Sequence, residues 1–365
     1  MKRVLFINNI PAPYRIDFFN ELGKYVELTA LFEAKTTPFT VFNYNLKDIR
    51  TFRAVFLREG HIRERNIDWR VLRYLKRGQF DTVIVSNYAY FTEAAAILAL
   101  KLRKIPYEME LDGGVNRKEN PLLHAAKRIL IRGAKRYWST GRRTDEFLTE
   151  FGVSREMIVR YPFTSISERD LVSGVLAAEK KLALRKSLGI PYKNMVLSVG
   201  KPVMRKGFDL LIRAAAEFPP DTGIYIIGGN PLDEWLEIIR QNDLKNIHFV
   251  SFCERDTLTQ YYRAADVFAF PTREDVWGLV VNEAMANGVP VVTTVGCVAG
   301  CEMIRDGENG FLIPTDVWEP LAERVNRMLN DESLRRRIAE AGLSTVRGYT
   351  VEAMARAHAE VFNRD

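Results

Sequence analysis

The residues best suited to chemistry gather in two loops rich in glycine and charge. The first runs from Gly200 to Gly207, carries Lys201 and Lys206, and follows an apolar run at Met195 to Val199. Loops at the carboxyl ends of parallel strands are where α/β proteins bind ligands. Two cations there can neutralise a diphosphate whose negative charge grows as a nucleotide departs. A solvated basic turn is the alternative for this loop taken alone.

The second loop consists of Asp275, Val276, Trp277 and Gly278, and it precedes an apolar helical run that begins at Leu279. The first turn of a helix offers free backbone N–H groups to an anion. Glycine in the loop lets a ligand approach the backbone closely. We therefore expect an anionic group, such as a phosphate, to bind at this helix N-terminus.

Two carboxylates add to this set. Glu283 lies inside the same helix among apolar neighbours, where a carboxylate usually needs a partner. The two hydroxyls of a ribose are such a partner in dinucleotide sites, whereas a solvated helix glutamate is the alternative. Asp112 stands at the C-terminal end of another expected strand and is followed by Gly113 and Gly114, which leave the chain free to turn. It can contact a sugar hydroxyl or a forming cationic sugar, or cap a turn.

The elements that position these residues alternate between strands and helices, which predicts two parallel sheets with crossover helices. A polar helical stretch from Asp170 to Ser187 separates the two series. The expected N-terminal elements are strands 4–7, 26–32, 82–85 and 107–111 and helices 16–25 and 92–102. The expected C-terminal elements are strands 195–199, 224–227, 248–252, 267–270 and 291–294 and helices 208–216, 233–242, 258–264 and 279–286.

Length and charge limit the classes of protein to which this chain can belong. A chain of 365 residues exceeds the usual size of one hydrophobic core, which favours two domains. Residues 1–160 hold 29 Lys and Arg against 18 Asp and Glu, whereas the rest holds 24 against 28. This asymmetry predicts that the N-terminal half meets something anionic, unless the basic surface only serves solubility. No recognised nucleic-acid-binding module accompanies the charge.

The cysteines and apolar runs indicate a cytoplasmic protein. Cys253, Cys297 and Cys301 are too few and odd in number for a disulfide framework, and no zinc-type spacing is present. Cys297 and Cys301 are expected to be small packed residues near the second loop. The first apolar run ends at Asn8, too soon for a signal peptide, and no run reaches a membrane-spanning length. The four histidines form no pattern and are interpreted as structural or surface residues.

The segment from Pro121 to Trp138 is predicted to form one amphipathic helix. Five cations fall on one half, and the apolar residues fall on the other, where we expect them to pack in the core. The basic half would then face an anionic membrane surface. The cations are Lys127, Arg128, Arg132, Lys135 and Arg136, and the apolar residues are Leu122, Ala126, Ile129, Leu130, Ala134 and Tyr137.

Together these motifs resemble the family 4 glycosyltransferases. The loop from Gly200 to Gly207 is similar to that family's Gly-Arg-…-Lys-Gly motif, and Asp275 to Gly288 resembles its E-x7-E region. The resemblance covers about residues 195 to 315 and includes Gly228-Gly229, Tyr261 to Asp266 and Asp306 to Gly310. The opening from Asn8 to Leu22, with Tyr161 to Ser165, is similar to a subgroup that assembles bacterial capsule and exopolysaccharide.

The resemblance implies a GT-B fold, in which two Rossmann-like domains face each other across a cleft. It implies a retaining transfer from a nucleoside-diphosphate sugar to a glycan or polyprenyl-diphosphate-linked acceptor, with no cofactor and no metal ion. The N-terminal, acceptor-binding domain would span 1–165 and receive the C-terminal helix, about 349–365. The donor-binding domain would span 166–348. The protein would lie in the cytoplasm, at the inner face of the cell membrane.

The resemblance also assigns roles. Lys201 and Lys206 match the diphosphate-binding residues, although arginine is common at the position of Lys201. Glu283 matches the ribose-binding glutamate. The glutamate expected eight residues earlier is Asp275 here, with Glu274 one step away, so Asp275 receives the contact with the donor sugar and Glu274 receives it if the loop is shifted.

Asp112 stands where a histidine pair often faces that sugar. The predicted catalytic set is therefore Asp112 with Lys201, Lys206 and Asp275. The nucleotide-sugar contacts are Gly200, Lys201, Lys206, Glu283 and every residue from Glu274 to Leu279. The alternatives are a phosphorolytic or epimerising enzyme of the same fold and a noncatalytic partner subunit of another transferase.

Overall fold

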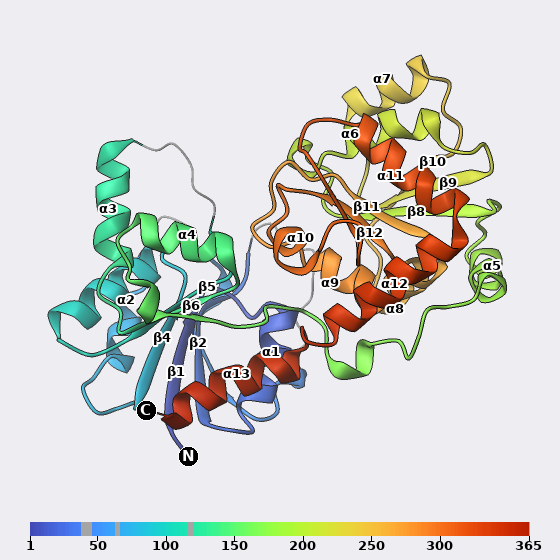
Figure 1. Cartoon of the computed structure of the whole chain (residues 1–365). Helices are drawn as coiled ribbons and strands as arrows, with labels where there is room; N and C mark the ends of the chain where they lie inside the picture. Colours follow the sequence, from blue (N-terminus) through green and yellow to red (C-terminus); the bar gives the residue numbers. More distant parts are fainter. Residues whose placement is uncertain (38–45, 63–65, 115–119, 365) are drawn as a thin grey trace. The chain divides into compact units, whose positions relative to one another are not determined.

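The computed structural model describes residues 1–37, 46–62, 66–114 and 120–364, which form two compact units (Figure 1). Unit 1 comprises Met1–Ser167 and Thr350–Asp365, and unit 2 comprises Glu168–Tyr349. The expected boundary after residue 165 lies two residues before the observed one. The last helix, α13 (Val351–Arg364), packs against α1 (Pro13–Leu22) inside unit 1.

Unit 1 is built on a parallel sheet in the order β3-β2-β1-β4-β5-β6-β7. Its central strands are short and buried on both faces, as expected where helices cover both sides of a parallel sheet; β1 and β4 are largely apolar, whereas β5 carries two buried glutamates. The strands are β1 Arg3–Asn8, β2 Glu27–Thr36, β3 Arg53–His61, β4 Thr82–Ser86, β5 Glu108–Leu111, β6 Arg136–Ser139 and β7 Ile158–Arg160. The remaining helices are α2 Phe91–Leu102, α3 Pro121–Ile131 and α4 Arg142–Glu150.

Unit 2 has a parallel sheet in the order β10-β9-β8-β11-β12-β13. This is the doubly wound order of dinucleotide-binding folds, in which the strand order reverses between β8 and β11. The strands are β8 Asn194–Val199, β9 Thr222–Ile227, β10 Ile247–Val250, β11 Val267–Phe270, β12 Val291–Thr294 and β13 Phe311–Ile313. The helices are α5 Ala178–Ser187, α6 Phe208–Ala214, α7 Asp233–Gln241, α8 Arg255–Ala264, α9 Leu279–Ala286, α10 Val298–Met303, α11 Glu319–Asn330 and α12 Glu332–Val346.

The predicted helix from Pro121 to Trp138 is wrong in its second half. The helix α3 ends at Ile131, Gly133 turns the chain at φ +99°, and β6 follows. Asn120 caps the start of α3, because its side chain accepts a hydrogen bond from the Leu122 amide at 2.9 Å. The amphipathic pattern continues across the turn at Gly133, so helical periodicity alone did not distinguish β6 from a continued helix.

The two faces expected for this segment also differ from the observed ones. Only Ile131 of α3 is buried, and Leu122 and Ile129 are 81% and 62% exposed. The expectation that the apolar half packs in the core is therefore wrong for α3. Lys135 and Arg136 lie beyond the end of α3 and pair with the buried Glu108 at 3.2 and 2.8 Å, so the expectation that all five cations line one face of a helix is also wrong.

The polar stretch from Asp170 to Ser187 is only partly helical, because α5 begins at Ala178. Two buried cations fasten α5 to the sheet of unit 2. Arg185 pairs with Asp266 at 2.5 Å, and Lys181 donates a hydrogen bond to the Ala265 carbonyl at 2.7 Å. The stretch is therefore an integral part of unit 2. Within the described residues, no helix is both long enough and apolar enough to cross a membrane.

Candidate functional site

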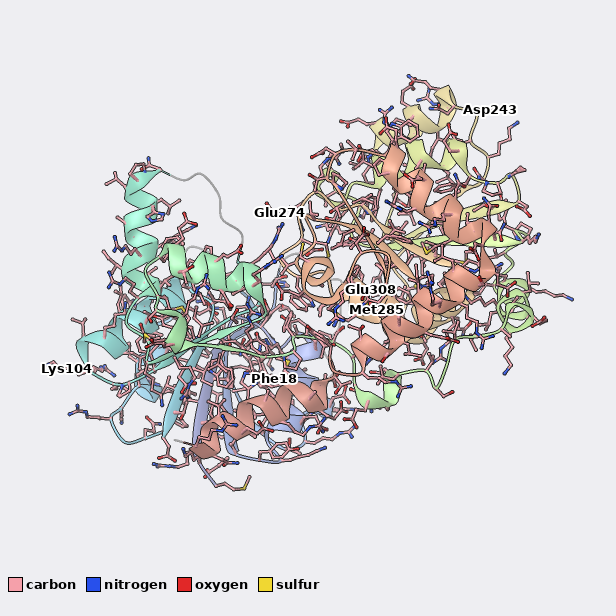
Figure 2. All side chains as sticks on the ribbon, in the orientation of Figure 1. Phe18, Lys104, Asp243, Glu274, Met285 and Glu308 are labelled. Atoms are coloured by element: carbon pink, nitrogen blue, oxygen red, sulfur yellow. The ribbon has the colours of Figure 1, made fainter. Side chains whose placement is uncertain are left out.

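The two predicted loops meet at one edge of the unit 2 sheet. The loop after β8 contains Gly200 to Gly207, and the loop after β11 leads to α9. Because β8 and β11 are neighbours at the point where the strand order reverses, both loops leave the sheet at its topological switch point. Figure 2 shows Glu274, which belongs to the second loop, outside the strands of unit 2.

Lys206 and Asp275 form an ion pair that joins the two loops. The side chains are 13% and 15% exposed, so the pair is partly shielded from water but still open to a ligand. The Lys206 Nζ also lies 4.9 Å from the centroid of the Phe270 ring, which favours a cation. An anionic ligand with hydroxyl groups can therefore meet a fixed cation and a carboxylate at one place.

The backbone of the first loop is held tightly against the second. Gly207 has φ +69°, and a Cβ atom there would stand 2.0 Å from the Pro271 carbonyl oxygen. Arg273 reinforces the contact, since its guanidinium binds Asp209 through two hydrogen bonds of 2.8 and 2.7 Å and Asp316 through one of 2.6 Å. These bonds restrict the backbone of the first loop and so fix the position of Lys206.

The second loop is packed on Cys297. A Cβ atom on Gly278, whose φ is +98°, would lie 2.6 Å from the Cys297 Sγ. That thiol donates to the Trp277 carbonyl at 3.3 Å. Burial raises the pKa of Cys297 to about 12, so it stays a neutral thiol and a packing residue, as predicted. Cys301 is half-buried.

The members of the second loop differ in what they offer a ligand. Trp277 is buried, and its indole N–H donates to Asn282 at 2.9 Å, so its side chain supports the loop from inside. Val276 is exposed. Leu279 begins α9, whose first two amides have no partner within the helix, whereas the Val281 amide donates to the carbonyl of the N-cap residue Gly278 at 2.9 Å.

Glu283 is held by a buried tyrosine that the sequence reasoning missed. The Tyr262 hydroxyl donates to Glu283 Oε2 at 2.9 Å. Burial and the nearby carboxylate raise the pKa of Tyr262 well above its usual value, so the hydroxyl stays a hydrogen-bond donor at neutral pH. Glu283 is half-buried, neither a fully solvated glutamate nor a core residue. The signal lies in the stretch Tyr261 to Asp266, which is part of the resemblance to the family 4 glycosyltransferases.

The remaining predicted contacts lie around the pair. Gly200 lies next to Lys206, because a Cβ atom on Gly200 would be 3.7 Å from Lys206 Cε. Lys201 follows it and is exposed. The Glu274 carbonyl accepts a hydrogen bond from Arg205 at 2.5 Å. The ion pair with Lys206 places the carboxylate of Asp275 at the site.

Asp112 lies in unit 1, within a network of buried polar groups at the carboxyl edge of the sheet. Its carboxylate accepts from Arg15, from Tyr14 at 3.1 Å and from Tyr161 at 3.4 Å. Arg15 also pairs with the buried Glu110 at 2.7 Å. The Asp112 side chain keeps 36% of its surface exposed. These donors hold the carboxylate in place at the end of β5.

The network continues into α13 through His358. Its Nε2 lies 3.5 Å from Glu110 Oε1, its Nδ1 lies 2.9 Å from the Met354 carbonyl, and its ring stacks on Trp138 with centroids 4.0 Å apart. Phe18, labelled in Figure 2, lies beside the same imidazole. The sequence reasoning missed these partners. The sequence signal for these partners was the row of carboxylates at alternate positions along β5 and just after it, because buried carboxylates require a cation nearby.

Two further carboxyl groups of unit 1, Glu33 and Glu93, are buried, so the stability of this unit should depend on pH. Within the described part of the chain, both oxygens of Glu93 and Oε2 of Glu33 make no hydrogen bond. Burial raises the pKa of Glu33 to about 6, and burial with the Glu33 charge raises the pKa of Glu93 well above the usual range. The folded state therefore favours the protonated form of each group.

We expect Glu33→Gln to stabilise unit 1 at neutral pH by about 1–2 kcal/mol, because it removes the cost of ionising a buried carboxyl group. The folded pKa exceeds the unfolded one, so the stability linked to the proton is fully present below the unfolded pKa. It is lost as pH rises through about 6. The gain of the variant should thus appear above that pH and vanish toward about pH 4. Thermal unfolding across this range measures it, and a gain independent of pH would contradict the assignment.

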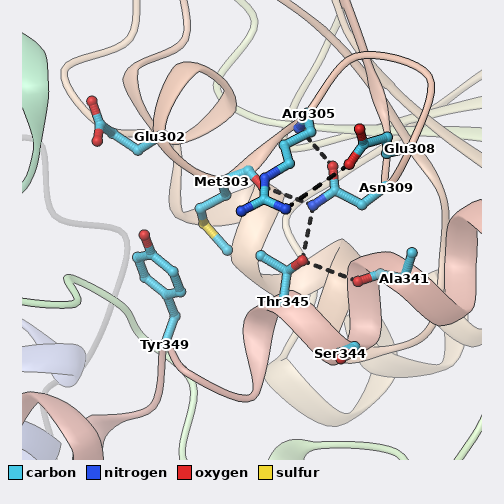
Figure 3. A pocket seen from close by; sticks show the side chains of 9 residues that line it. All are labelled: Glu302, Met303, Arg305, Glu308, Asn309, Ala341, Ser344, Thr345 and Tyr349. Carbon is cyan, nitrogen blue, oxygen red and sulfur yellow. Dashed lines mark hydrogen bonds and ion pairs between the residues drawn. The ribbon is translucent and has the colours of Figure 1, made fainter.

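A separate pocket of about 510 Å³ lies beside the turn from Asp306 to Gly310 (Figure 3). Asn309 fastens this turn to α10 and α12. Its amide donates to the Met303 carbonyl at 2.9 Å and to Thr345 at 2.8 Å, and it accepts from the Arg305 amide at 2.7 Å. The motif around Asn309 is thus a structural turn. Among the described residues, no group of three His, Cys, Asp or Glu side chains is placed to hold a metal ion.

Comparison with known families and proteins places this geometry in context. Residues 180–345 match the family model described as "Glycosyl transferases group 1". The D-inositol 3-phosphate glycosyltransferase of Xylanimonas cellulosilytica is 31% identical over 195 residues, which are 51% of this chain and 46% of that protein. The match thus spans about half the length of that relative.

Another relative matches over a longer span. It is the N,N'-diacetylbacillosaminyl-diphospho-undecaprenol alpha-1,3-N-acetylgalactosaminyltransferase of Campylobacter jejuni, 22% identical over 77% of this chain and 76% of its own. Among solved structures, Anabaena Alr3699/HepE in complex with UDP and glucose has a TM-score of 0.77 at 17% identity over 100% of both chains. WaaG, involved in lipopolysaccharide biosynthesis, has a TM-score of 0.71 at 19% identity over 98% and 99% of the two chains. The likeness shows the fold, GT-B with two Rossmann-like domains.

Proposed function

We propose that this chain, whose residues 180–345 match the model of the group 1 glycosyl transferases, transfers a sugar from a nucleoside-diphosphate sugar to a hydroxyl group of an acceptor. The acceptor is a glycan or a lipid-linked glycan of a bacterial surface polysaccharide. The transfer retains the anomeric configuration. The relatives that support this acceptor class include a glycosyltransferase of lipopolysaccharide core biosynthesis in Rhizobium meliloti, 30% identical over 59% of this chain and 60% of its own.

The observation that carries the proposal is the Lys206 and Asp275 pair at the switch point of unit 2. Lys206 binds the diphosphate, because a partly shielded cation stabilises the charge that develops on a leaving phosphate. Asp275 then accepts hydrogen bonds from hydroxyls of the transferred sugar. The first amides of α9 bind phosphate oxygens beside them. Lys201 adds a second, more exposed positive charge.

The reaction follows from these contacts. The bond between the anomeric carbon and the diphosphate oxygen breaks, and its electron pair stays on the diphosphate, next to Lys206. The acceptor hydroxyl attacks the same face of the cationic sugar, and its proton passes to the departing phosphate oxygen. No protein nucleophile is needed, which agrees with the buried neutral thiol of Cys297.

Glu283 binds the ribose of the nucleotide. Tyr262 occupies Oε2 of Glu283, and the rest of the carboxylate accepts from the ribose hydroxyls. We expect Glu283→Gln to weaken binding of the bare nucleoside diphosphate by about tenfold, because a charged hydrogen bond is replaced by a neutral one. Isothermal titration measures the affinity, with Glu237→Gln, an exposed helix glutamate of unit 2, as the matched control. Unchanged affinity would remove Glu283 from the ribose site.

The transfer requires no divalent metal ion in this proposal, because lysines supply the positive charge that a metal ion supplies in other transferases. We expect full activity in excess EDTA. Loss of activity in EDTA with recovery on addition of Mg²⁺ or Mn²⁺ would contradict this part of the proposal and leave the sugar transfer itself intact.

The test of the proposed function is a panel of nucleoside-diphosphate sugars scored by thermal stabilisation of the full chain. The stabilising donor is then incubated with lipid-linked and soluble glycan acceptors, and release of nucleoside diphosphate is measured with and without acceptor. Acceptor-dependent release is the expected result. Formation of a sugar 1-phosphate that depends on inorganic phosphate would indicate the phosphorolytic alternative, and absence of nucleotide binding would indicate a noncatalytic subunit.

A further inference from the structure

The pocket beside the turn from Asp306 to Gly310 lies within unit 2 (Figure 3). Its lining residues come from α10, from the segment around this turn, and from α12 with the residues just after it. Among the described lining residues, none belongs to the loop from Gly200 to Gly207 or to the loop before α9. Its volume of about 510 Å³ falls within the range of about 300–1,000 Å³ typical of small-molecule sites. The pocket is therefore large enough for a ligand of its own.

The wall of this pocket is fixed by buried polar contacts. The Asn309 side chain donates to Thr345 Oγ1 at 2.8 Å, and this hydroxyl donates to the Ala341 carbonyl at 3.0 Å. The helix α12 approaches the turn closely at Gly342, where an added Cβ atom would stand 3.2 Å from the Asn309 carbonyl oxygen. These contacts join the turn to α12, so a ligand meets a site that is already formed.

The uncharged part of the lining suits a ligand with an apolar face and hydroxyl groups at its edge. Met303 and Ala341 offer aliphatic surface, and Tyr349 offers an aromatic ring that ends in a hydroxyl group. The hydroxyl of Ser344 can donate and accept hydrogen bonds. A pyranose ring combines a face of C–H groups with hydroxyl groups around its edge, so it matches this lining.

The charged part of the lining does not suit an anion. Among the described residues of the lining, Arg305 supplies a positive charge, whereas Glu302 and Glu308 supply two negative ones. Figure 3 shows Glu302 on one side of the pocket and Arg305 with Glu308 on the other, where the pair is 4.0 Å apart. A phosphate or nucleotide would lack the excess of cations that binds it. Carboxylates instead accept hydrogen bonds from hydroxyl groups.

We propose that this pocket is a second saccharide site, which holds one neutral hexopyranose unit of a glycan apart from the sugar that the candidate site takes. Glu302 and Glu308 accept hydrogen bonds from ring hydroxyls, and the Tyr349 ring packs on the C–H face of the sugar. Ser344 adds a hydrogen bond at the edge. The inference rests on the lining of the pocket and does not depend on sugar transfer by the chain.

The helix α10 joins this pocket to the second loop of the candidate site. Its first amides donate to the carbonyls of Asp275 and Trp277 at 3.3 and 2.7 Å, and Glu302 near its other end lines the pocket. The Tyr349 ring also lies near Trp277, with centroids 6.4 Å apart. A sugar unit in the pocket is thus held one short helix away from Asp275, a position that suits the retention of a glycan chain beside the candidate site.

The experiment is saturation-transfer difference NMR of the full chain with the methyl α-glycosides of glucose, galactose, mannose and N-acetylglucosamine at millimolar concentration. We expect saturation transfer to at least one of them. Ser344→Trp, which places an indole at the pocket from an exposed position of α12, should abolish the transfer. Glu302→Gln should weaken binding of that glycoside about tenfold, because it removes a charged acceptor. Melting temperatures confirm that both variants are folded.

Two control variants separate this pocket from other surfaces. Ser187→Trp places the same side chain at the exposed end of α5 and should leave the transfer unchanged. Asp275→Asn alters the carboxylate proposed to bind the transferred sugar and should also leave it unchanged. Ser344→Trp should remain as well stabilised by nucleoside diphosphates as the wild type, because the pocket is not the nucleotide site.

Equal saturation transfer in the wild type, Ser344→Trp and Glu302→Gln would overturn the proposal, as would the absence of transfer to any of these glycosides. Loss of transfer in Asp275→Asn with retention in Ser344→Trp would place the sugar in the candidate site and also overturn it. A preference of about tenfold or more for protonated glucosamine would assign the pocket to a cation instead. The proposed function fails separately, through absence of nucleotide binding, whichever result the glycosides give.

Discussion

Lys206→Ala should lower turnover about 100- to 1000-fold with the donor at saturation, because removing one preorganised contact to a developing charge typically costs about 2.7–4 kcal/mol in the transition state. Lys206 is the cation that the two loops hold closest to Asp275. Its effect should therefore appear mainly in kcat, since diphosphate charge grows as the sugar bond breaks. Steady-state rates with the donor found by the nucleotide-sugar screen measure it.

The control for Lys206→Ala is Lys193→Ala, which removes an exposed lysine of unit 2 whose nearest carboxylate lies 4.0 Å away. That variant should retain wild-type turnover and melting temperature, whereas Lys206→Ala leaves the partly buried Asp275 without its cation and should lower the melting temperature while the protein stays folded in the assay. Turnover of Lys206→Ala near the wild-type value would remove Lys206 from the diphosphate. Stabilisation of Lys206→Ala by nucleoside diphosphates, compared with that of the wild type, would show whether nucleotide binding itself persists.

Arg15→Met should destabilise unit 1 by about 3–5 kcal/mol, because it leaves a buried carboxylate without its cation. Arg15 is the cation between Glu110 and Asp112, and its side chain and that of Glu110 are almost fully buried. Burial alone raises the pKa of Glu110, but the Arg15 charge, the nearby His358 and the hydrogen bond from Ser86 outweigh it and lower that pKa. Glu110 thus depends on Arg15 to remain ionised.

Hydrogen exchange followed by mass spectrometry measures this effect, because it resolves β1 and β5 of unit 1 while the strands of unit 2 serve as an internal reference. Arg3→Met is the matched control, since Arg3 pairs with Asp81 at the surface and should cost less than about 1 kcal/mol. The double variant Arg15→Met with Glu110→Gln should recover part of the loss, because it leaves no unpaired charge at position 110. A loss equal to that of Arg3→Met would show that the buried pair contributes no more than a surface pair.

Most elements of unit 2 could be predicted from local patterns. The expected strands 267–270 and 291–294 and the helix 279–286 have the observed bounds. Their apolar runs are short and complete, and glycine and proline mark their ends. The strands β3, β6, β7 and β13 were not predicted. They lie toward the edges of their sheets, where pairing partners determine the conformation. Polar residues interrupt the apolar pattern in β3, β6 and β7, and β13 is an apolar run of only three residues.

The candidate site was predictable to a different depth in each unit. In unit 2 the loop residues were named from charge, glycine spacing and their place after strands, and the structure brings Lys206 and Asp275 into contact. In unit 1 only Asp112 was named, whereas Arg15, Glu110 and His358 determine its surroundings. No motif links these residues, because they come from α1, β5 and α13, which meet only after folding.

The fold class, the order of the main elements and the loops that carry the chemistry could be predicted from local patterns, because periodicity, glycine and charge act over a few neighbouring residues. Which groups meet depends on how the folded chain brings distant segments together. Lys206 and Asp275 are 69 residues apart along the chain, and Arg15 and Asp112 are 97 residues apart. The structure alone also decided that Leu122 and Ile129 of α3 face outward, since an amphipathic pattern states that a helix has two faces but not which of them the rest of the protein covers.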